Sequence, residues 1–325
     1  MTESAIFIGA GPGGSQPQQL QLSRANRQRV LYTSAGHRHR QCVLRVSARV
    51  AANPDPNRNM NPVTPVPLKL PATTRSGPCA HLEPGAIAKC LDAALRGAGL
   101  EQSLTATHPH LFSAHTVFVT PADLAAMRAV IEAVEQVVAH PAYVAEVARH
   151  APAARHDTGN PGGFLGFDFH LDPDGPKLIE INTNAGGMLL GVALLRAQLS
   201  CCRPLRERLP GHGDPDRIED EIVEMMQHEW RAAGRGTPLT RIAIVDENPV
   251  SQFLHPEFVL FEKLFRRHGI NALIADPAEL ALRDRRLWAG TQPIALVYNR
   301  LTDFAPDQPA HPTLREAWLA NLAVV

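Results

Sequence analysis

Apolar residues recur with a helical spacing in two long stretches of the chain. Residues 117–140 carry them at intervals of three and four, which predicts a helix with one buried face. This helix would start with Thr120 as N-cap, a proline at the first helical position and Asp123 as the acid of a capping box. Residues 216–234 repeat the spacing, and Gly234 supplies a C-cap.

Strand-like patterns lie on both sides of the turn sequence Asp-Pro-Asp-Gly at 172–175. Proline suits the first position of a turn and glycine a left-handed one, so we expect a hairpin with a three-residue loop, 173–175. That loop pairs residue 172 with residue 176 and places Asp168 opposite Glu180. Because side chains alternate along a strand, one face is expected to carry Asp168, His170, Leu178, Glu180 and Asn182.

From Thr240 onward, strands and helices alternate. Apolar runs predict strands at 241–246, 270–276 and 293–300, with a helix at 256–269 and a short helix at 277–284 between them. Such alternation predicts a small parallel sheet with right-handed crossovers. Open sheets of this kind bind ligands at the carboxyl ends of their strands, where this chain has Asp246–Asn248 and Asn299–Arg300.

These patterns predict an α/β protein in three parts. Residues 1–79 are Arg-rich and then Pro- and Asn-rich, which predicts a disordered basic arm and an extended linker. Residues 80–238 are expected to form an α+β part with helices, including one at 188–199, and the hairpin. Residues 239–325 are expected to form a Rossmann-like domain around the small open parallel sheet.

Composition narrows the class of protein. The chain has 325 residues, 44% hydrophobic and 20% charged, which is ordinary for a globular protein. Its apolar runs are far shorter than the ~20 residues of a membrane span. The first 60 residues hold eight arginines against two acids, but no sustained amphipathic helix and no aromatic stacking groups, so we expect a plain extension rather than a transit peptide or a nucleic-acid-binding arm.

The cysteines and two other motifs do not indicate a specific binding or catalytic site. Five cysteines form no recognisable metal or disulfide pattern, and the adjacent Cys201 and Cys202 are expected to be buried or free thiols of a reducing, cytoplasmic compartment. The glycines at 9, 11 and 14 have dinucleotide-binding spacing, but Pro17 interrupts the helix that this fold requires. The histidines at 108–115 are expected to lie in an ordinary loop.

The predicted hairpin face carries the most specific chemistry in the sequence. Asp168, Glu180 and Asn182 would bring two carboxylates and an amide oxygen together. Neighbouring carboxylates repel unless a cation or proton lies between them, and hard oxygen donors suit Mg²⁺. The alternative is a polar face exposed to water. Gly186 and Gly187 come just before a predicted helix, where backbone N–H groups can approach an anion.

At these residues the chain resembles the ATP-grasp ligases. The segment Asp168-Phe169 followed by Glu180-Ile181-Asn182-Thr183 is similar to their last metal-binding motif. The order of elements resembles, more narrowly, the circularly permuted eukaryotic-type glutathione synthetases, and the runs at 284–288 and 294–300 are similar to their substrate domain. The resemblance covers roughly residues 160–320, about half of the chain.

The resemblance implies an ATP-dependent carboxylate–amine ligase that works through an acyl phosphate. Asp168, Glu180 and Asn182 would hold Mg²⁺ against the phosphates of ATP, the second cofactor. Asn184, Gly186 and Gly187 would lie at the bound cofactor and substrate. Arg300 would hold a substrate carboxylate in the catalytic pocket. Asn299 and Gln252 are further candidates for this substrate pocket, and the partners are a small carboxylate and an amine or peptide.

Two departures from the family leave alternatives open. The family often has a basic residue where this chain has Gly166, and none of the four lysines is placed to grip a phosphate. In the permuted order the nucleotide-binding lobes follow the substrate domain, so we expect this chain to be an incomplete ATP-grasp enzyme, inactive on its own. The alternatives are a non-catalytic module that binds a small carboxylate or peptide, and a metal-dependent hydrolase that uses His170. The sequence is also compatible with a homodimer.

Overall fold

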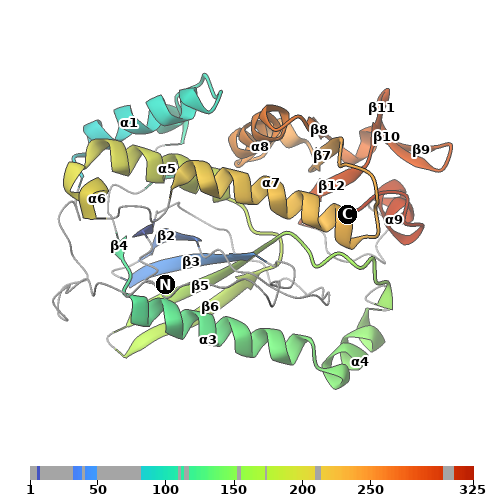
Figure 1. Cartoon of the computed structure of the whole chain (residues 1–325), viewed down its shortest axis with the longest axis horizontal. Helices are drawn as coiled ribbons and strands as arrows, with labels where there is room; N and C mark the ends of the chain where they lie inside the picture. Colours follow the sequence, from blue (N-terminus) through green and yellow to red (C-terminus); the bar gives the residue numbers. More distant parts are fainter. Residues whose placement is uncertain are drawn as a thin grey trace, which may run out of the picture.

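The computed structural model describes residues 6–7, 32–38, 41–49, 82–108, 111–112, 117–151, 155–172, 174–208, 214–302 and 311–325. Much of the predicted arm and linker at 1–79 lies outside these ranges, as do the motif glycines at 9, 11 and 14. The fold is mixed α/β, with helices around small sheets (Figure 1). No helix in the described part of the chain is long and apolar enough to cross a membrane.

A four-stranded antiparallel sheet is built around the predicted hairpin. Its strands are β5 (Phe164–Asp172) and β6 (Gly175–Asn182), extended through β3 (Gln41–Arg49) to β2 (Tyr32–Arg38). The order is β2-β3-β5-β6, so two strands of the sheet come from the stretch that was expected to be disordered. The two-residue strands β1 (Ile6–Phe7) and β4 (Val117–Phe118) pair separately.

Helix α3 (Pro121–Val138) covers one face of this sheet (Figure 1). The predicted capping box is present, because Thr120 Oγ1 accepts from the Asp123 backbone N–H and Asp123 Oδ2 accepts from the Thr120 backbone N–H, both at 3.1 Å. The face of α3 that was predicted to be buried packs on the strands in one apolar cluster, whose fully buried members are Val119, Leu124, Met127, Ile131, Phe167 and Phe169.

The hairpin has the predicted pairing of Asp168 with Glu180, but its turn length differs from the prediction and one strand contains a bulge. The turn has two residues, with Asp172 paired to Gly175, rather than the expected three. A β-bulge at Ile179 then shifts the register by one residue, so that Asp168 still lies opposite Glu180. The expected position of Leu178 is therefore wrong, because Leu178 lies opposite Phe169 and packs in the α3 cluster. Lys177 takes the position opposite His170.

Helices α5 (Met188–Cys201) and α7 (Pro215–Ala232) lie above the sheet in Figure 1, and α1 (Pro84–Gly97) and α8 (His255–Arg267) pack against them. Glu219 of α7 binds Arg196 of α5 and Arg267 of α8 through its two carboxylate oxygens. Cys90 and Cys201 form a disulfide between α1 and α5, so the expectation of a buried or free thiol is wrong for Cys201. Shorter helices are α2 (Leu104–Thr107), α4 (Pro141–His150) and α6 (Arg203–Arg208).

The predicted parallel sheet is present in the last part of the chain. Its order is β12-β7-β8, with β7 (Arg241–Val245) at the centre, β8 (Asn271–Ala275) on one side and β12 (Leu296–Asn299) on the other. Val324 adds a parallel bridge to Leu296 at the outer edge. One continuous apolar core joins this sheet and α8 to α1, α5 and α7, so the packing runs across the predicted boundary at 238/239.

A β-meander replaces the short helix predicted at 277–284. After a single 3₁₀ turn at Pro277–Glu279, β9 (Leu280–Arg283), β10 (Arg286–Ala289) and β11 (Gln292–Ile294) form an antiparallel sheet. Asp284 and Arg285, between β9 and β10, both have positive φ, the conformation of a two-residue hairpin turn, and β9 pairs with β10 across this turn. Another 3₁₀ turn, Pro249–Ser251, follows β7, and helix α9 (Pro312–Leu319) packs beside the meander.

Candidate functional site

The hairpin brings the three predicted metal-binding residues onto one face. Asp168 lies opposite Glu180, and Gly166 lies opposite Asn182 one pair further along. The Asn182 side-chain amide donates to Glu180 Oε1 at 3.1 Å, so these two side chains point the same way. Asp168 is buried, whereas Glu180 is exposed. On the other side of β5, the residue in register with Asp168 is Arg45 of β3.

This donor set suits a hard divalent cation. Two carboxylates and an amide oxygen are oxygen ligands, and Mg²⁺ is usually held by one or two carboxylates with water and phosphate completing its shell. The described residues contain no group of three His, Cys, Asp or Glu side chains that could hold a metal ion. Asp168, His170 and Glu180 therefore do not assemble into the cluster that the hydrolase hypothesis requires. The predicted magnesium set has only two such residues and remains a prediction.

Arg300 lies at the carboxyl end of β12 and contacts the segment that follows the hairpin. Its Nη1 donates to Asn184 Oδ1 at 3.0 Å, to the Asn184 backbone oxygen at 3.2 Å and to the Ala185 backbone oxygen at 2.9 Å. The guanidinium also lies over the rings of Tyr298 and Phe258. Arg300 is only 7% exposed. The structure thus joins two predicted site residues, Asn184 and Arg300, in a buried contact.

Electrostatics hold this arginine in its charged form. Burial by itself lowers the pKa of Arg300, but Tyr298, Glu257 and Asp246 together raise it above its usual value. Burial in turn raises the pKa of the Tyr298 hydroxyl. The Asp246 carboxyl, at the end of the neighbouring strand β7, is also buried, and this raises its pKa to about 6. The carboxyl ends of β7 and β12 therefore carry a buried acid and a buried base close together.

Gly186 allows the close approach of the hairpin to the parallel sheet. A Cβ at this position would contact Leu254 Cδ1 at 2.8 Å and would overlap Arg300 Nη2. Only a residue without a side chain fits between them. The sequence pointed to Gly186 as a contact for a bound anion, and in the structure it lies against a protein cation.

The start of α5 already binds a carboxylate of the protein itself. Glu257 of α8 accepts from the Gly187 backbone N–H at 2.7 Å and from the Leu189 backbone N–H at 3.0 Å. Glu257 is fully buried, and its negative charge complements the positive end of the helix dipole. The amide that was predicted to meet a bound anion at Gly187 is therefore directed at Glu257.

The remaining predicted substrate residues lie at the same edge of the parallel sheet. Gln252 donates to the backbone oxygen of Glu247 at 2.6 Å, and Asn299 Oδ1 accepts from the Leu301 backbone N–H at 3.0 Å. Both side chains thus support the loops in which they lie. Asn299 also lines a pocket, as does Asn184.

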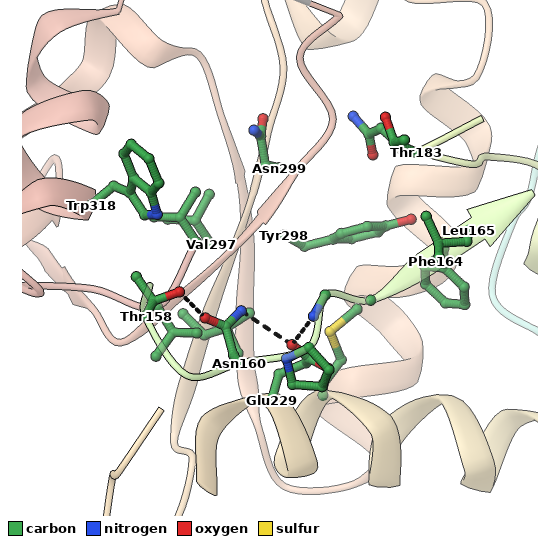
Figure 2. Close-up of a pocket in the computed structure, with 18 of the residues that line it drawn as sticks. Thr158, Asn160, Phe164, Leu165, Thr183, Glu229, Val297, Tyr298, Asn299 and Trp318 are labelled. Carbon is green, nitrogen blue, oxygen red and sulfur yellow. Dashed lines mark hydrogen bonds between the residues drawn. The ribbon is translucent and has the colours of Figure 1, made fainter. Parts of the chain in front are cut away.

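That pocket, of about 270 Å³, is a feature that the sequence did not reveal (Figure 2). Its walls come from the end of α3, residues within 156–163, the start of β5, the end of β6, α7, β12 and α9. Asn160 and Glu229 are buried in its wall, where Asn160 Nδ2 donates to Glu229 Oε2 at 3.1 Å. A loop residue and a helix residue 69 positions apart leave no motif in the sequence by which this pair could be found.

No protein-family model and no curated protein matches this sequence. Its function must therefore be argued from the residues that the fold brings together, because a fold by itself does not determine an activity. Two features are available for that argument: the hairpin face with its two carboxylates, and the junction of Asn184, Gly186 and Arg300.

Proposed function

We propose that the protein is an ATP-dependent carboxylate–amine ligase with a permuted ATP-grasp fold, similar to glutathione synthetase. The observation that carries this proposal is the placement of Asp168 directly opposite Glu180, with the Asn182 amide on Glu180. A bulge restores this pairing after a turn that would otherwise have removed it. Pairing of two carboxylates in neighbouring strands costs free energy through repulsion, and a bound cation offsets this cost.

In this proposal Asp168, Glu180 and Asn182 hold Mg²⁺, which supplies charge neutralisation for phosphoryl transfer from ATP. Asp168 is the buried ligand and Glu180 the exposed one, so the ion would approach from the Glu180 side. Arg300 supports the substrate end. Its permanent charge favours a carboxylate ligand, and it becomes available to one when its Asn184 contact is exchanged for the ligand.

The proposal is tested by calorimetry of the full chain with MgCl₂ and with Mg-ATP. Wild type is expected to bind Mg²⁺, and Glu180→Gln to weaken this binding at least about tenfold because it removes one of two anionic ligands. Glu101→Gln is the matched control, since Glu101 is exposed and lies on a different segment. Equal Mg²⁺ affinity of Glu180→Gln and wild type would overturn the metal site and with it the ligase.

A second candidate is a non-catalytic module that binds a small carboxylate or a peptide. One observation weighs against the ligase: Glu257 already binds the amides at the start of α5 that would meet a phosphate of ATP. A peptide ligand that binds equally well in the presence of EDTA, together with no affinity for Mg-ATP, would favour this module over the ligase.

A further inference from the structure

The pocket beside the hairpin is separate from the proposed metal face. Phe167 and Ile181, which face α3, line it, whereas Asp168, Glu180 and Asn182 do not. Its volume of about 270 Å³ corresponds to roughly nine water molecules. Such a space suits a small organic molecule.

The walls of the pocket combine apolar surface with negative charge. Val134 and Val138 of α3 and Val297 of β12 provide apolar surface, together with Leu165, Phe167, Ile181 and Met226. The acids in its lining are Glu135, Asp157 and Glu229, whereas His156 is its one basic residue within the described part of the chain. A phosphate or carboxylate would meet like charges here, so the lining favours a cation.

Glu229 is the best-placed acid for a bound cation. It is 4% exposed, and its Oε2 is fixed by the Gly162 backbone N–H at 2.8 Å and by Asn160 Nδ2 at 3.1 Å (Figure 2). Thr158 in turn donates to Asn160, so a chain of hydrogen bonds orients the carboxylate. A buried, pre-oriented carboxylate interacts more strongly with a charge than one in water.

Two further groups suit an ammonium ligand. Trp318 of α9 lines the pocket, with its ring roughly perpendicular to that of His156 at 4.7 Å between centroids, and an indole face attracts cations. Thr183 Oγ1 is buried and has no hydrogen-bond partner among the described residues, so it can accept from an ammonium N–H. Figure 2 shows Trp318, Thr183 and Glu229 reaching the pocket from three different elements.

We propose that this pocket binds a small organic ammonium compound with a short apolar chain, whose charge is balanced by the buried carboxylate of Glu229. The apolar chain lies against α3 and β12. This site goes beyond the proposed ligase, because none of the three magnesium residues contributes to the pocket, although Asn184 and Asn299, two predicted ligand-binding residues of the ligase, line it.

The test uses three probes of similar size and different charge: n-butylammonium, 1-butanol and butyrate. They are titrated into the full chain in EDTA, without nucleotide, and followed by the indole N–H signals of the three tryptophans. Trp318 lines the pocket, whereas the indole N–H groups of Trp230 and Trp288 donate to backbone oxygens elsewhere. Trp318→Phe assigns its signal.

We expect n-butylammonium to shift the Trp318 signal alone, and to bind roughly tenfold to hundredfold more tightly than butanol, as for a hydrogen bond to a charged group. Butyrate should not bind. Glu229→Gln should remove the preference of the pocket for the ammonium probe over butanol. If butyrate or butanol binds as tightly as n-butylammonium, or if the Trp318 signal does not move, the proposal is wrong.

A second pair of variants allows the proposal to be tested even if the Glu229 variant does not fold. Val138→Trp fills the pocket from α3 and should abolish binding of n-butylammonium. Val137→Trp adds the same side chain at the neighbouring position, which is 57% exposed and outside the pocket, and should leave binding unchanged. Binding that survives Val138→Trp would overturn the proposed location. Loss of Mg²⁺ binding in Glu180→Gln with retained ammonium binding would show that the two sites are separate.

Discussion

Nη1 of Arg300 lies 3.0 Å from Oδ1 of Asn184, across 116 residues of sequence. The same nitrogen also donates to two backbone oxygens, so one guanidinium fixes the chain that leaves the hairpin to the end of β12. The contact joins the segment after β6 of the antiparallel sheet to the end of β12 of the parallel sheet.

Replacement of Arg300 is expected to destabilise the fold strongly. Arg300→Ala leaves three oxygens without their donor and leaves Asp246 and Glu257 without a neighbouring cation, which should cost about 3 kcal/mol of unfolding free energy. Urea denaturation measures this loss. Arg217→Ala is the control, because Arg217 makes an exposed ion pair with Glu221 and should cost less than about 1 kcal/mol. Equal losses in the two variants would contradict a buried structural role for Arg300.

A methyl group at Gly186 should act on the same junction. Gly186→Ala forces the new Cβ against Leu254 and Arg300, and overpacking of this kind costs about 1–3 kcal/mol. Gly191→Ala is a matched control within α5, where a Cβ meets no atom within 4 Å and helix propensity should stabilise by about 0.5–1 kcal/mol. Thermal denaturation is expected to move in opposite directions for the two variants, and a shift of the same sign would be inconsistent with the close approach.

Asp246 predicts a pH dependence of stability. Burial raises its pKa from 3.8 to about 6 in the folded protein, so between these values the folded state binds more protons than the unfolded state. The unfolding free energy should therefore fall as pH rises from about 4 to about 6. Asp246→Asn should remove this contribution, on the order of 1–2 kcal/mol, and flatten the slope in urea titrations at stepped pH. An unchanged slope would rule out Asp246 as its source.

The Cys90–Cys201 disulfide predicts sensitivity to reductant. It closes a loop across 111 residues and links α1 to α5, so its loss should cost about 2–4 kcal/mol. Peptide mapping without reduction should recover the Cys90 and Cys201 peptides joined. The double variant Cys90→Ser/Cys201→Ser should be less stable than wild type under oxidising conditions. Reaction of both cysteines with a thiol reagent in the untreated protein would contradict the disulfide.

The hairpin shows which features of the fold could be predicted from the sequence and which could not. The turn residues and the alternation of side chains were sufficient to pair Asp168 with Glu180, and the structure has that pair. The turn length and the position of Leu178 were both wrong. The predicted pair is present all the same, because the bulge at Ile179 compensates for the shorter turn. A bulge depends on how the strand packs on α3, and that packing is not contained in the local sequence.

The predicted helix at 277–284 failed for a different reason. A short, partly apolar run fits a helix and a strand equally well, and pairing with β10 decided the outcome. The contact of Asn184 with Arg300 was also not predictable, since each residue was identified separately as a ligand-binding group. Residues that meet only through tertiary packing, such as Asn160 and Glu229, gave no local signal at all.

The carboxylate of Glu257 at the first amides of α5 has a mechanical consequence. It anchors the start of that helix to α8, three residues after the point where Arg300 grips the chain behind the hairpin. The short connector between β6 and α5 is thus clamped at both ends by side chains of the parallel-sheet region. The position of the carboxyl end of β6 is therefore tied to the positions of β12 and α8 through these hydrogen bonds.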